Sequence, residues 1–162
     1  MYILVYTHLV WLLELVQKLN SKRVPFALVG GYAVALHGAV RGTLDIDLVI
    51  PYELGAYESL EAALLSLGLK SRLPVSAQEV FHFRDEYASK RNLVAWSFYH
   101  PQEARKIVDV IVTEDLTKLK TKSVSVEQTP VRIVSIEDLI AMKRRSGRPQ
   151  DIADVEALER LK

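Results

Sequence analysis

The sequence predicts an α/β (α+β) domain, in which a mixed β-sheet is flanked by helices and followed by a C-terminal helical pair. Two patterns support this fold class. Short apolar runs typical of strands alternate with amphipathic stretches typical of helices through most of the 162 residues. From about residue 135 to the end, only helical signals occur. We therefore expect a single domain over residues 1–162, with residues 135–162 as an appendage to it.

The N-terminal segment is strongly apolar and predicts a helix over residues 7–20. A membrane-spanning helix needs roughly 20 consecutive apolar residues, and His8, Glu14, Gln17 and Lys18 interrupt this one. A signal peptide would need a basic start and a small-residue cleavage site, and neither is present. We expect this helix to pack on the domain, without contact to a membrane.

The middle of the chain alternates strands with helices. The predicted strands cover residues 25–29, 44–50, 92–99 and 106–112, with two short ones at 124–126 and 131–134. The predicted helices cover residues 32–37 and 53–67. Residues 75–88 fit a helix or a loop, and both remain open.

The C-terminal region carries end signals for two helices. Ser135 followed by Asp138 resembles an N-terminal capping arrangement, and the helix that it opens runs to about residue 145, before Gly147. Pro149 suits the first turn of a second helix that continues to the end.

The composition excludes several kinds of protein. A net charge of +1 at pH 7 gives no overall basic field for non-specific nucleic-acid binding. The chain has no cysteine, which excludes a disulfide framework, a thiol nucleophile and thiolate metal ligands. These features fit a cytoplasmic protein.

Two aspartates stand in the strand predicted at residues 44–50. Residues two apart in a strand point to the same face, so Asp45 and Asp47 project together. Two adjacent carboxylates repel each other, and burial of either one is costly. A divalent cation removes both costs, and Mg²⁺ prefers carboxylate oxygens. The alternative is a solvent-facing strand with two solvated aspartates.

A third carboxylate lies in the apolar run 107-IVDVIV-112. Such a run predicts a strand covered on both faces, where a lone charge is expensive. If this strand pairs beside the one at residues 44–50, Asp109 joins Asp45 and Asp47, and three carboxylates can bind one or two metal ions. The alternative for Asp109 is an ion pair with a buried Arg or Lys.

Gly30 and Gly31 stand between a predicted strand and a predicted helix. Two glycines permit a sharp turn and a close approach of backbone N–H groups to a phosphate. Arg41 and Thr43 come just before the carboxylate strand, where they can donate hydrogen bonds to phosphate oxygens. An ordinary turn for the glycines, and a salt bridge and a strand start for Arg41 and Thr43, remain open. His37 fits packing or capping better than catalysis.

These motifs together resemble the signature of the DNA polymerase β-type nucleotidyltransferase superfamily. Gly30-Gly31, a spacer of thirteen residues and Asp45-Ile46-Asp47 match its pattern, and Asp109 matches its third carboxylate. The stretch GGYAVALHG…RGTLDIDLVI is similar to the AbiEii-like and minimal nucleotidyltransferases, several of which are toxin–antitoxin partners. The resemblance implies a nucleotidyltransferase fold.

The C-terminal region resembles a second motif region of the same family. There a helix lysine precedes an Arg-x-x-Asp-x-x-Asp element, here Lys143, Arg148, Asp151 and Asp154. The resemblance implies that Lys143 reaches the nucleotide phosphates and that Asp151 lies near the same site. A solvated helix face for Lys143, and favourable charge at a helix start for the aspartates, are the alternatives.

The function that we expect is transfer of a nucleoside monophosphate from a nucleoside triphosphate to an acceptor hydroxyl, with Mg²⁺ (or Mn²⁺) as cofactor and pyrophosphate as the second product. The acceptor could be RNA, a protein or a small molecule. Residues 70–100 mix basic and aromatic side chains, which fits acceptor contact or ordinary packing.

Two other functions remain open. One is a catalytically silent interaction protein, such as a toxin–antitoxin partner, which uses the apolar N-terminal helix as an interface. The other is a metal-dependent phosphohydrolase, but the four histidines show no ligand spacing.

Overall fold

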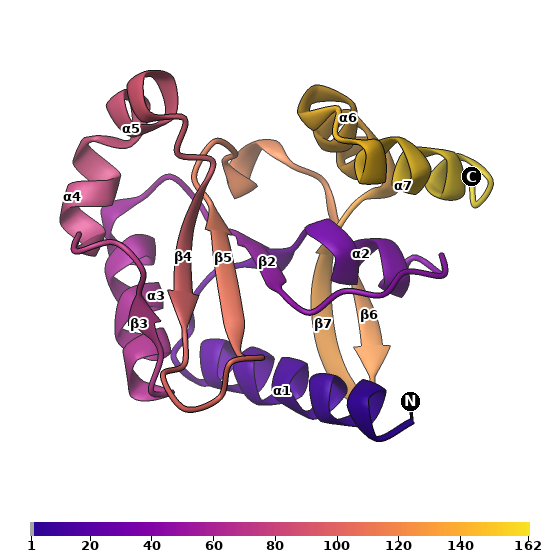
Figure 1. The fold of residues 1–162 in the computed structure, drawn as a ribbon, viewed down its shortest axis with the longest axis horizontal. Coiled ribbons are helices and arrows are strands. Elements are labelled where there is room, and N and C mark those ends of the chain that lie inside the picture. Colours follow the sequence, from indigo (N-terminus) through magenta and orange to yellow (C-terminus); the bar gives the residue numbers. More distant parts are fainter. Residues whose placement is uncertain (1) are drawn as a thin grey trace.

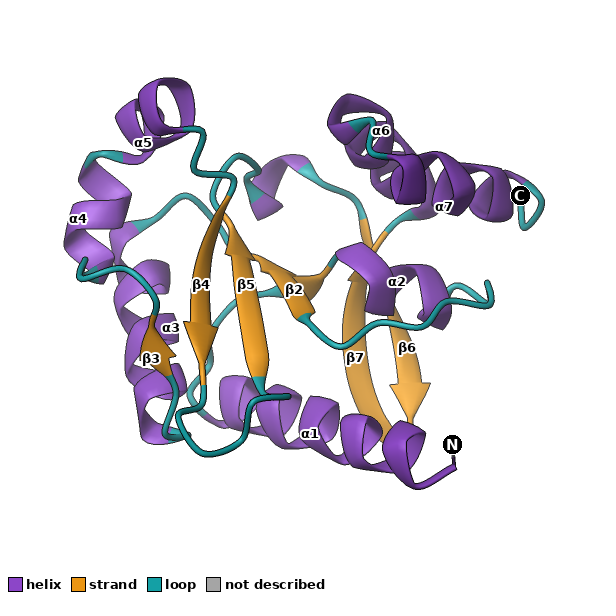
Figure 2. Ribbon diagram, viewed as in Figure 1, coloured by secondary structure: helices purple, strands orange, loops and turns teal. Residues whose placement is uncertain are grey.

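The computed structural model describes residues 2–162, with side chains placed from residue 8 onward. Within them the chain forms a seven-stranded mixed sheet in the order β3–β4–β5–β2–β1–β7–β6, with helices packed around it (Figures 1 and 2). The mixed sheet with flanking helices confirms the predicted fold class.

The strands are short, and most are separated by helices. They are β1 (Ala27–Leu28), β2 (Ile46–Val49), β3 (Lys70–Ser71), β4 (Ala95–Tyr99), β5 (Ile107–Ile111), β6 (Thr121–Val126) and β7 (Thr129–Val134). The α-helices are α1 (Tyr2–Ser21), α2 (Gly30–Leu36), α3 (Leu54–Ser66), α4 (Ala77–His82), α5 (Arg84–Arg91), α6 (Ile136–Ser146) and α7 (Pro149–Glu159). A 3₁₀ turn, η1 (Leu116–Lys118), follows β5. In Figure 1, α4 and α5 lie near one edge of the sheet, and α6 and α7 near the other.

The centre of the sheet is set by the pairing of β2. On one side β2 runs parallel to β5, and this register places Asp47 opposite Asp109. On the other side β2 runs antiparallel to β1, which in turn runs parallel to β7. β4 pairs antiparallel with the far side of β5. The two aspartate-bearing strands are therefore neighbours, as the sequence required for a shared site.

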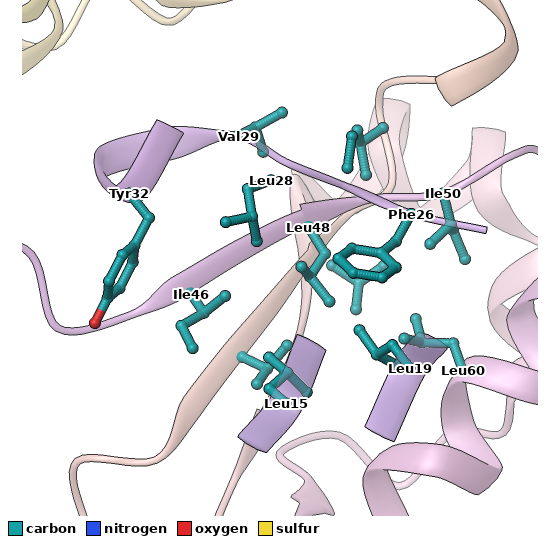
Figure 3. Packing of buried hydrophobic residues seen from close by; sticks show 14 of the residues in the cluster. Leu15, Leu19, Phe26, Leu28, Val29, Tyr32, Ile46, Leu48, Ile50 and Leu60 are labelled. Carbon is teal, nitrogen blue, oxygen red and sulfur yellow. The ribbon is translucent and has the colours of Figure 1, made fainter. Parts of the chain in front are cut away.

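One face of the central strands forms the core. Ile46, Leu48, Val108 and Val110 are fully buried. Figure 3 shows Ile46 and Leu48 directed toward Leu15 of α1. Because side chains alternate along a strand, the residues between these apolar ones face the other way. The core thus fixes which face of the sheet carries the aspartates.

Helix α1 packs one apolar face against this core. Trp11, Leu12, Leu15, Val16 and Leu19 are buried, at the spacing of one helix face. Of the residues that the structure describes, none belongs to a helix long and apolar enough to cross a membrane. From residue 8 onward, packing on the domain accounts for the apolar character of this segment.

Several boundaries differ from those that the sequence predicts. The strand predicted at residues 44–50 begins only at Ile46, and Leu44 is exposed rather than buried behind the sheet. Residues 75–88 form helices: Ser76 caps α4 in a capping box with Glu79, and α5 follows. β3 was not predicted, because its two residues, one of them a lysine, carry no apolar pattern.

The last two strands are longer than predicted and form a hairpin. Its turn residues, Glu127 and Gln128, both have positive φ. Such turns usually contain glycine or asparagine, so the sequence gives no signal for this one.

Truncation of Leu15 tests the packing of α1. Leu15→Ala should lower the free energy of unfolding by about 2–5 kcal/mol, because Leu15 is fully buried and its loss leaves a cavity. Val10→Ala, on an exposed position of the same helix, should change it by less than about 0.5 kcal/mol. Urea unfolding followed by circular dichroism measures both. Equal effects would contradict the placement of the helix.

Candidate functional site

The turn between β1 and α2 brings the backbone against Asp47. Gly30 has φ +60°, and a Cβ there would lie 1.8 Å from Asp47 Oδ2. A Cβ on Gly31 would lie 2.6 Å from Thr43 Cβ. The Gly31 backbone N–H also donates a hydrogen bond to the Asp47 carboxylate. Both glycines are therefore required by close approach, which is more than an ordinary turn demands.

The three predicted carboxylates lie close enough to act on one another. Burial, then the charges of Asp109 and Asp45, raise the pKa of Asp47 to about 6. Burial and the charge of Asp109 likewise raise the pKa of Asp45, against a smaller opposing effect of Arg72. Asp45 stands just before β2 rather than within it. The fold thus gathers like charges at one place, where they destabilise each other.

Asp109 has an unsatisfied atom in this cluster. Its Oδ1 is buried and has no hydrogen-bond partner. The ion pair with a buried Arg or Lys, which the sequence left open for Asp109, is not among those of the described residues. A buried carboxylate oxygen without a partner is costly, and native structures seldom leave one without a reason.

These carboxylates fit a hard divalent cation. All are oxygen donors, they carry excess negative charge, and one oxygen is unpartnered. Mg²⁺ usually takes only one or two protein carboxylates and completes its shell with water and phosphate oxygens. Among the described residues, no group of three or more His, Cys, Asp or Glu side chains lies in an arrangement that could hold a metal ion by itself.

A cleft of about 540 Å³ opens beside Asp47. Gly30 and Asp47 line it together with Lys143 and Asp151 from the C-terminal helices. The predicted site residues from the two ends of the chain therefore meet. Lys143 is only 6% exposed, so the alternative of a solvated helix face for this lysine is wrong.

Buried ion pairs fix Lys143 in this cleft. Its Nζ lies 3.2 Å from Asp151 Oδ1 and 2.7 Å from Asp154 Oδ2. Arg148 Nε lies 2.8 Å from the other oxygen of Asp151, and Arg41 Nε lies 3.1 Å from Asp154 Oδ1. We call these five residues the Lys143 network. It carries three cations and two carboxylates, so it is a positive counterpart to the aspartate cluster.

The network also controls the ionisation of its members. Burial would raise the pKa of Asp151, but hydrogen bonds from Arg148, Ser146 and Lys143 outweigh it and lower this pKa. Asp151 therefore stays charged. Lys143 acts on Asp47 from the same position, because its charge opposes the rise in the Asp47 pKa.

Arg41 and Thr43 lie apart from the cleft. Arg41 forms the salt bridge to Asp154 that the sequence left open as an alternative. Thr43 packs against Gly31 and lies within 3.4 Å of the Asp45 carbonyl oxygen. Both line a second cavity, next to Asp45. The structure thus places them beside the first aspartate rather than with Gly30 and Lys143.

Sequence reasoning missed Tyr32 and the role of Asp154. Tyr32 is buried, its hydroxyl has no partner, and burial together with the Asp45 charge raises its pKa to about 12. An aromatic residue after two glycines gives no signal of this. The Arg-x-x-Asp-x-x-Asp spacing drew attention to Asp154, but the sequence did not show that Asp154 pairs with Lys143 and Arg41. His37 packs as expected, with Nε2 2.8 Å from the Val134 carbonyl oxygen.

Some of the basic and aromatic residues at 70–100 serve in packing. Trp96 and Phe98 are fully buried, and the Arg84 guanidinium lies 4.3 Å from the centre of the Tyr52 ring. This favours the packing alternative for Trp96, Phe98 and Arg84. Acceptor contact stays a prediction for four exposed residues of this stretch: His82, Phe83, Lys90 and Arg91.

The raised pKa of Asp47 predicts a pH-dependent penalty on stability. The folded-state pKa of about 6 exceeds the ordinary 3.8, so the penalty grows as the pH rises through this window. With divalent metal chelated, Asp47→Asn should raise the free energy of unfolding at pH 7.5, by up to about 3 kcal/mol, and change it little at pH 4. Urea unfolding at both pH values measures this. Asp85→Asn, at an exposed position, is the control, and a pH-independent gain in Asp47→Asn would contradict the prediction.

Solved structures share this fold at low sequence identity. ANT(2'')-Ia in complex with adenylyl-2''-tobramycin has a TM-score of 0.61 and 16% identity, over 94% of this chain and 87% of that one. The lincosamide antibiotic adenylyltransferase LnuA, with lincomycin bound, has a TM-score of 0.63 and 14% identity, over 94% and 96%. An antigenic nucleotidyltransferase-like protein from Paracoccidioides brasiliensis has a TM-score of 0.56 and 20% identity, over 89% and 71%.

No curated protein matches the chain. A family profile does, over residues 8–162, which is nearly the whole sequence. Its description agrees with the fold of the solved neighbours and with the superfamily that the glycine and aspartate motifs resemble. The chain belongs to the family described as nucleotidyl transferase of unknown function (DUF2204).

Proposed function

We propose that this protein is a single-domain, divalent-cation-dependent nucleotidyltransferase. It transfers a nucleoside monophosphate from a nucleoside triphosphate to an acceptor hydroxyl, and pyrophosphate leaves. The observation that carries the proposal is the aspartate cluster: Asp47 opposite Asp109 on parallel strands, beside Asp45, with Asp109 Oδ1 buried and unpartnered. Adenylyl transfer by two proteins of the same fold supports it.

The metal ligands in this proposal are Asp45, Asp47 and Asp109. A bound Mg²⁺ or Mn²⁺ would neutralise the triphosphate and lower the pKa of the acceptor hydroxyl. Without a cation these carboxylates are costly to ionise: burial first, and then the charges of neighbouring carboxylates, raise the pKa values of Asp45 and Asp47. Binding of a cation for catalysis explains why three carboxylates stay together despite this unfavourable free energy, and a purely structural role does not.

The protein positions the reactants and moves one proton. The acceptor oxygen forms a bond to the α-phosphorus while the bond from that phosphorus to its bridging oxygen breaks. Asp109 takes the proton of the acceptor hydroxyl on the carboxylate oxygen that does not hold a cation. The electron pair of the broken bond leaves with pyrophosphate.

The positive side of the cleft holds the phosphates. The backbone at Gly30, which lines the cleft and has no side chain in the way, approaches them most closely, while the Gly31 N–H donates to Asp47. Lys143 has three protons to donate, so two carboxylates leave one for a phosphate oxygen. Asp151 holds both Lys143 and Arg148 at the cleft. That Arg41 and Thr43 bind the nucleotide stays a prediction from the sequence. Their contacts with Asp154 and with the Asp45 carbonyl oxygen also suit them to fix the loop that carries Asp45.

The chain's place in the AbiEii-like group, a toxin–antitoxin partner and a cytoplasmic location remain predictions from the sequence. A catalytically silent interaction protein would have no use for the buried charge of the aspartate cluster. In the part of α1 whose side chains the structure describes, from residue 8 onward, Trp11, Leu12, Leu15, Val16 and Leu19 are buried in the domain and Val10 is exposed.

Removal of two carboxylates should abolish nucleotide binding. Titration calorimetry with Mg²⁺ and each ribonucleoside triphosphate should show saturable binding of at least one by wild type. The Asp45→Asn/Asp47→Asn variant, and wild type with metal chelated, should show none, because both lose the cation that bridges protein and triphosphate. The Asp85→Asn control should bind normally. Lack of binding by folded wild type would refute the proposed function.

Asp109 should hold the second cation. In electron paramagnetic resonance titrations with a non-hydrolysable triphosphate analogue, wild type should bind about two Mn²⁺ ions and Asp109→Asn about one. The Asp85→Asn control should match wild type. An unchanged stoichiometry in Asp109→Asn would contradict the role of this residue as a ligand.

A further inference from the structure

A second cavity lies against Asp45 and is not part of the triphosphate cleft. Its volume is about 910 Å³, and it lies between α1, α2 and the loop at residues 41–45. Asp45 lines this cavity, whereas Asp47 and Gly30 line the cleft. Because Asp45 and Asp47 belong to one cluster, the two hollows meet the reaction centre from different sides. A molecule in the second cavity would be adjacent to the proposed metal ligands.

The lining of this cavity is mostly apolar. Side chains from two helices and the loop provide it: Leu9, Leu12, Tyr32, Ala35, Leu36 and Leu44. A smaller cavity of about 390 Å³, lined by Trp11, shares His8 and Arg105 with it. The larger cavity alone exceeds what a simple sugar or amino acid requires, and the smaller one adds charged side chains next to it.

Two residues that line this space carry unsatisfied polar atoms. The Tyr32 hydroxyl and the Trp11 Nε1–H are buried and have no hydrogen-bond partner. Tyr32 is 9% exposed, and it lines the larger cavity together with Asp45. Buried donors normally find a partner, so a ligand that accepts hydrogen bonds would satisfy them.

The charges of the lining disfavour a cationic ligand. Arg41 is paired with Asp154, and Lys106 is paired with Glu14 and Glu103. Among the described residues, Arg105 pairs with no carboxylate. Of the described residues that line the larger cavity, Asp45 alone is a carboxylate, and the proposed function commits it to the metal. A polycation such as tobramycin would need several free carboxylates, and here it would meet a free arginine instead.

We propose that this cavity binds the acceptor, and that the acceptor is a largely apolar alcohol without positive charge. The apolar body lies between α1 and α2, and the Tyr32 hydroxyl donates to an oxygen of the acceptor. The reactive hydroxyl faces the aspartate cluster. This inference rests on the proposed function for the meaning of "acceptor", but the ligand class follows from the cavity itself.

The test compares two probes with different charge. Octyl β-D-glucoside, below its critical micelle concentration, is the neutral apolar alcohol, and tobramycin is the polycation. Calorimetry and tryptophan fluorescence measure the binding of each, in the presence of Mg²⁺. Ala35→Phe fills the cavity from α2, and Leu36→Trp is a second filling variant in case the first does not fold. Val40→Phe is the matched control, on an exposed position outside the lining.

Wild type and the Val40→Phe control should bind the glucoside saturably and tobramycin not at all. A folded filling variant should bind the glucoside at least about tenfold more weakly, and should bind the nucleoside triphosphate as wild type does. Preference for tobramycin, no binding of the glucoside, or binding unaffected by both filling variants would overturn the inference. Failure of the proposed function would appear separately, as loss of triphosphate binding by wild type.

Discussion

The parallel pairing of β2 with β5 is the constraint on which the site depends. It places Asp47 directly opposite Asp109 in the middle of a sheet whose other face is the hydrophobic core. The alternation that buries Ile46, Leu48, Val108 and Val110 forces the aspartates to the opposite face, and register forces them together. A slip of one residue in either strand would put a carboxylate into the core.

The repulsion and burial of the aspartates cost free energy. Residues that are distant in sequence partly offset this cost by interactions with Asp47. The turn at Gly30 lies so close to Asp47 that no other residue fits there, and Gly31 donates a hydrogen bond to the same carboxylate. From the C-terminal helices, Lys143 contributes positive charge. The C-terminal helical pair, predicted as an appendage, therefore completes the cleft. The buried ion pairs of the Lys143 network are better understood as fixing these positions than as adding stability.

Much of this could be predicted from the sequence, for identifiable reasons. Short apolar runs located the central strands, and a carboxylate within such a run marked Asp47 and Asp109, because burial makes such residues rare. The sequence could not show that Arg41 pairs with Asp154, since 113 positions separate them and arginine binds phosphate and carboxylate alike. Nor could it show the unpartnered Tyr32 hydroxyl, because satisfaction of a hydrogen bond depends on tertiary neighbours. Two-residue β3 and the Glu127–Gln128 turn lack any local pattern.

Asp154 sits between two regions that would otherwise be independent. One of its oxygens faces Lys143, which lines the cleft, and the other faces Arg41, which lines the second cavity. A ligand that drew Lys143 away from Asp154 would change the electrostatic hold on Arg41, and the reverse would hold equally. Such coupling is reciprocal: if one ligand changes the affinity for the other by some factor, the second ligand changes the affinity for the first by the same factor. If ligands in the two hollows affect each other, we expect the shared carboxylate of Asp154 to carry that coupling.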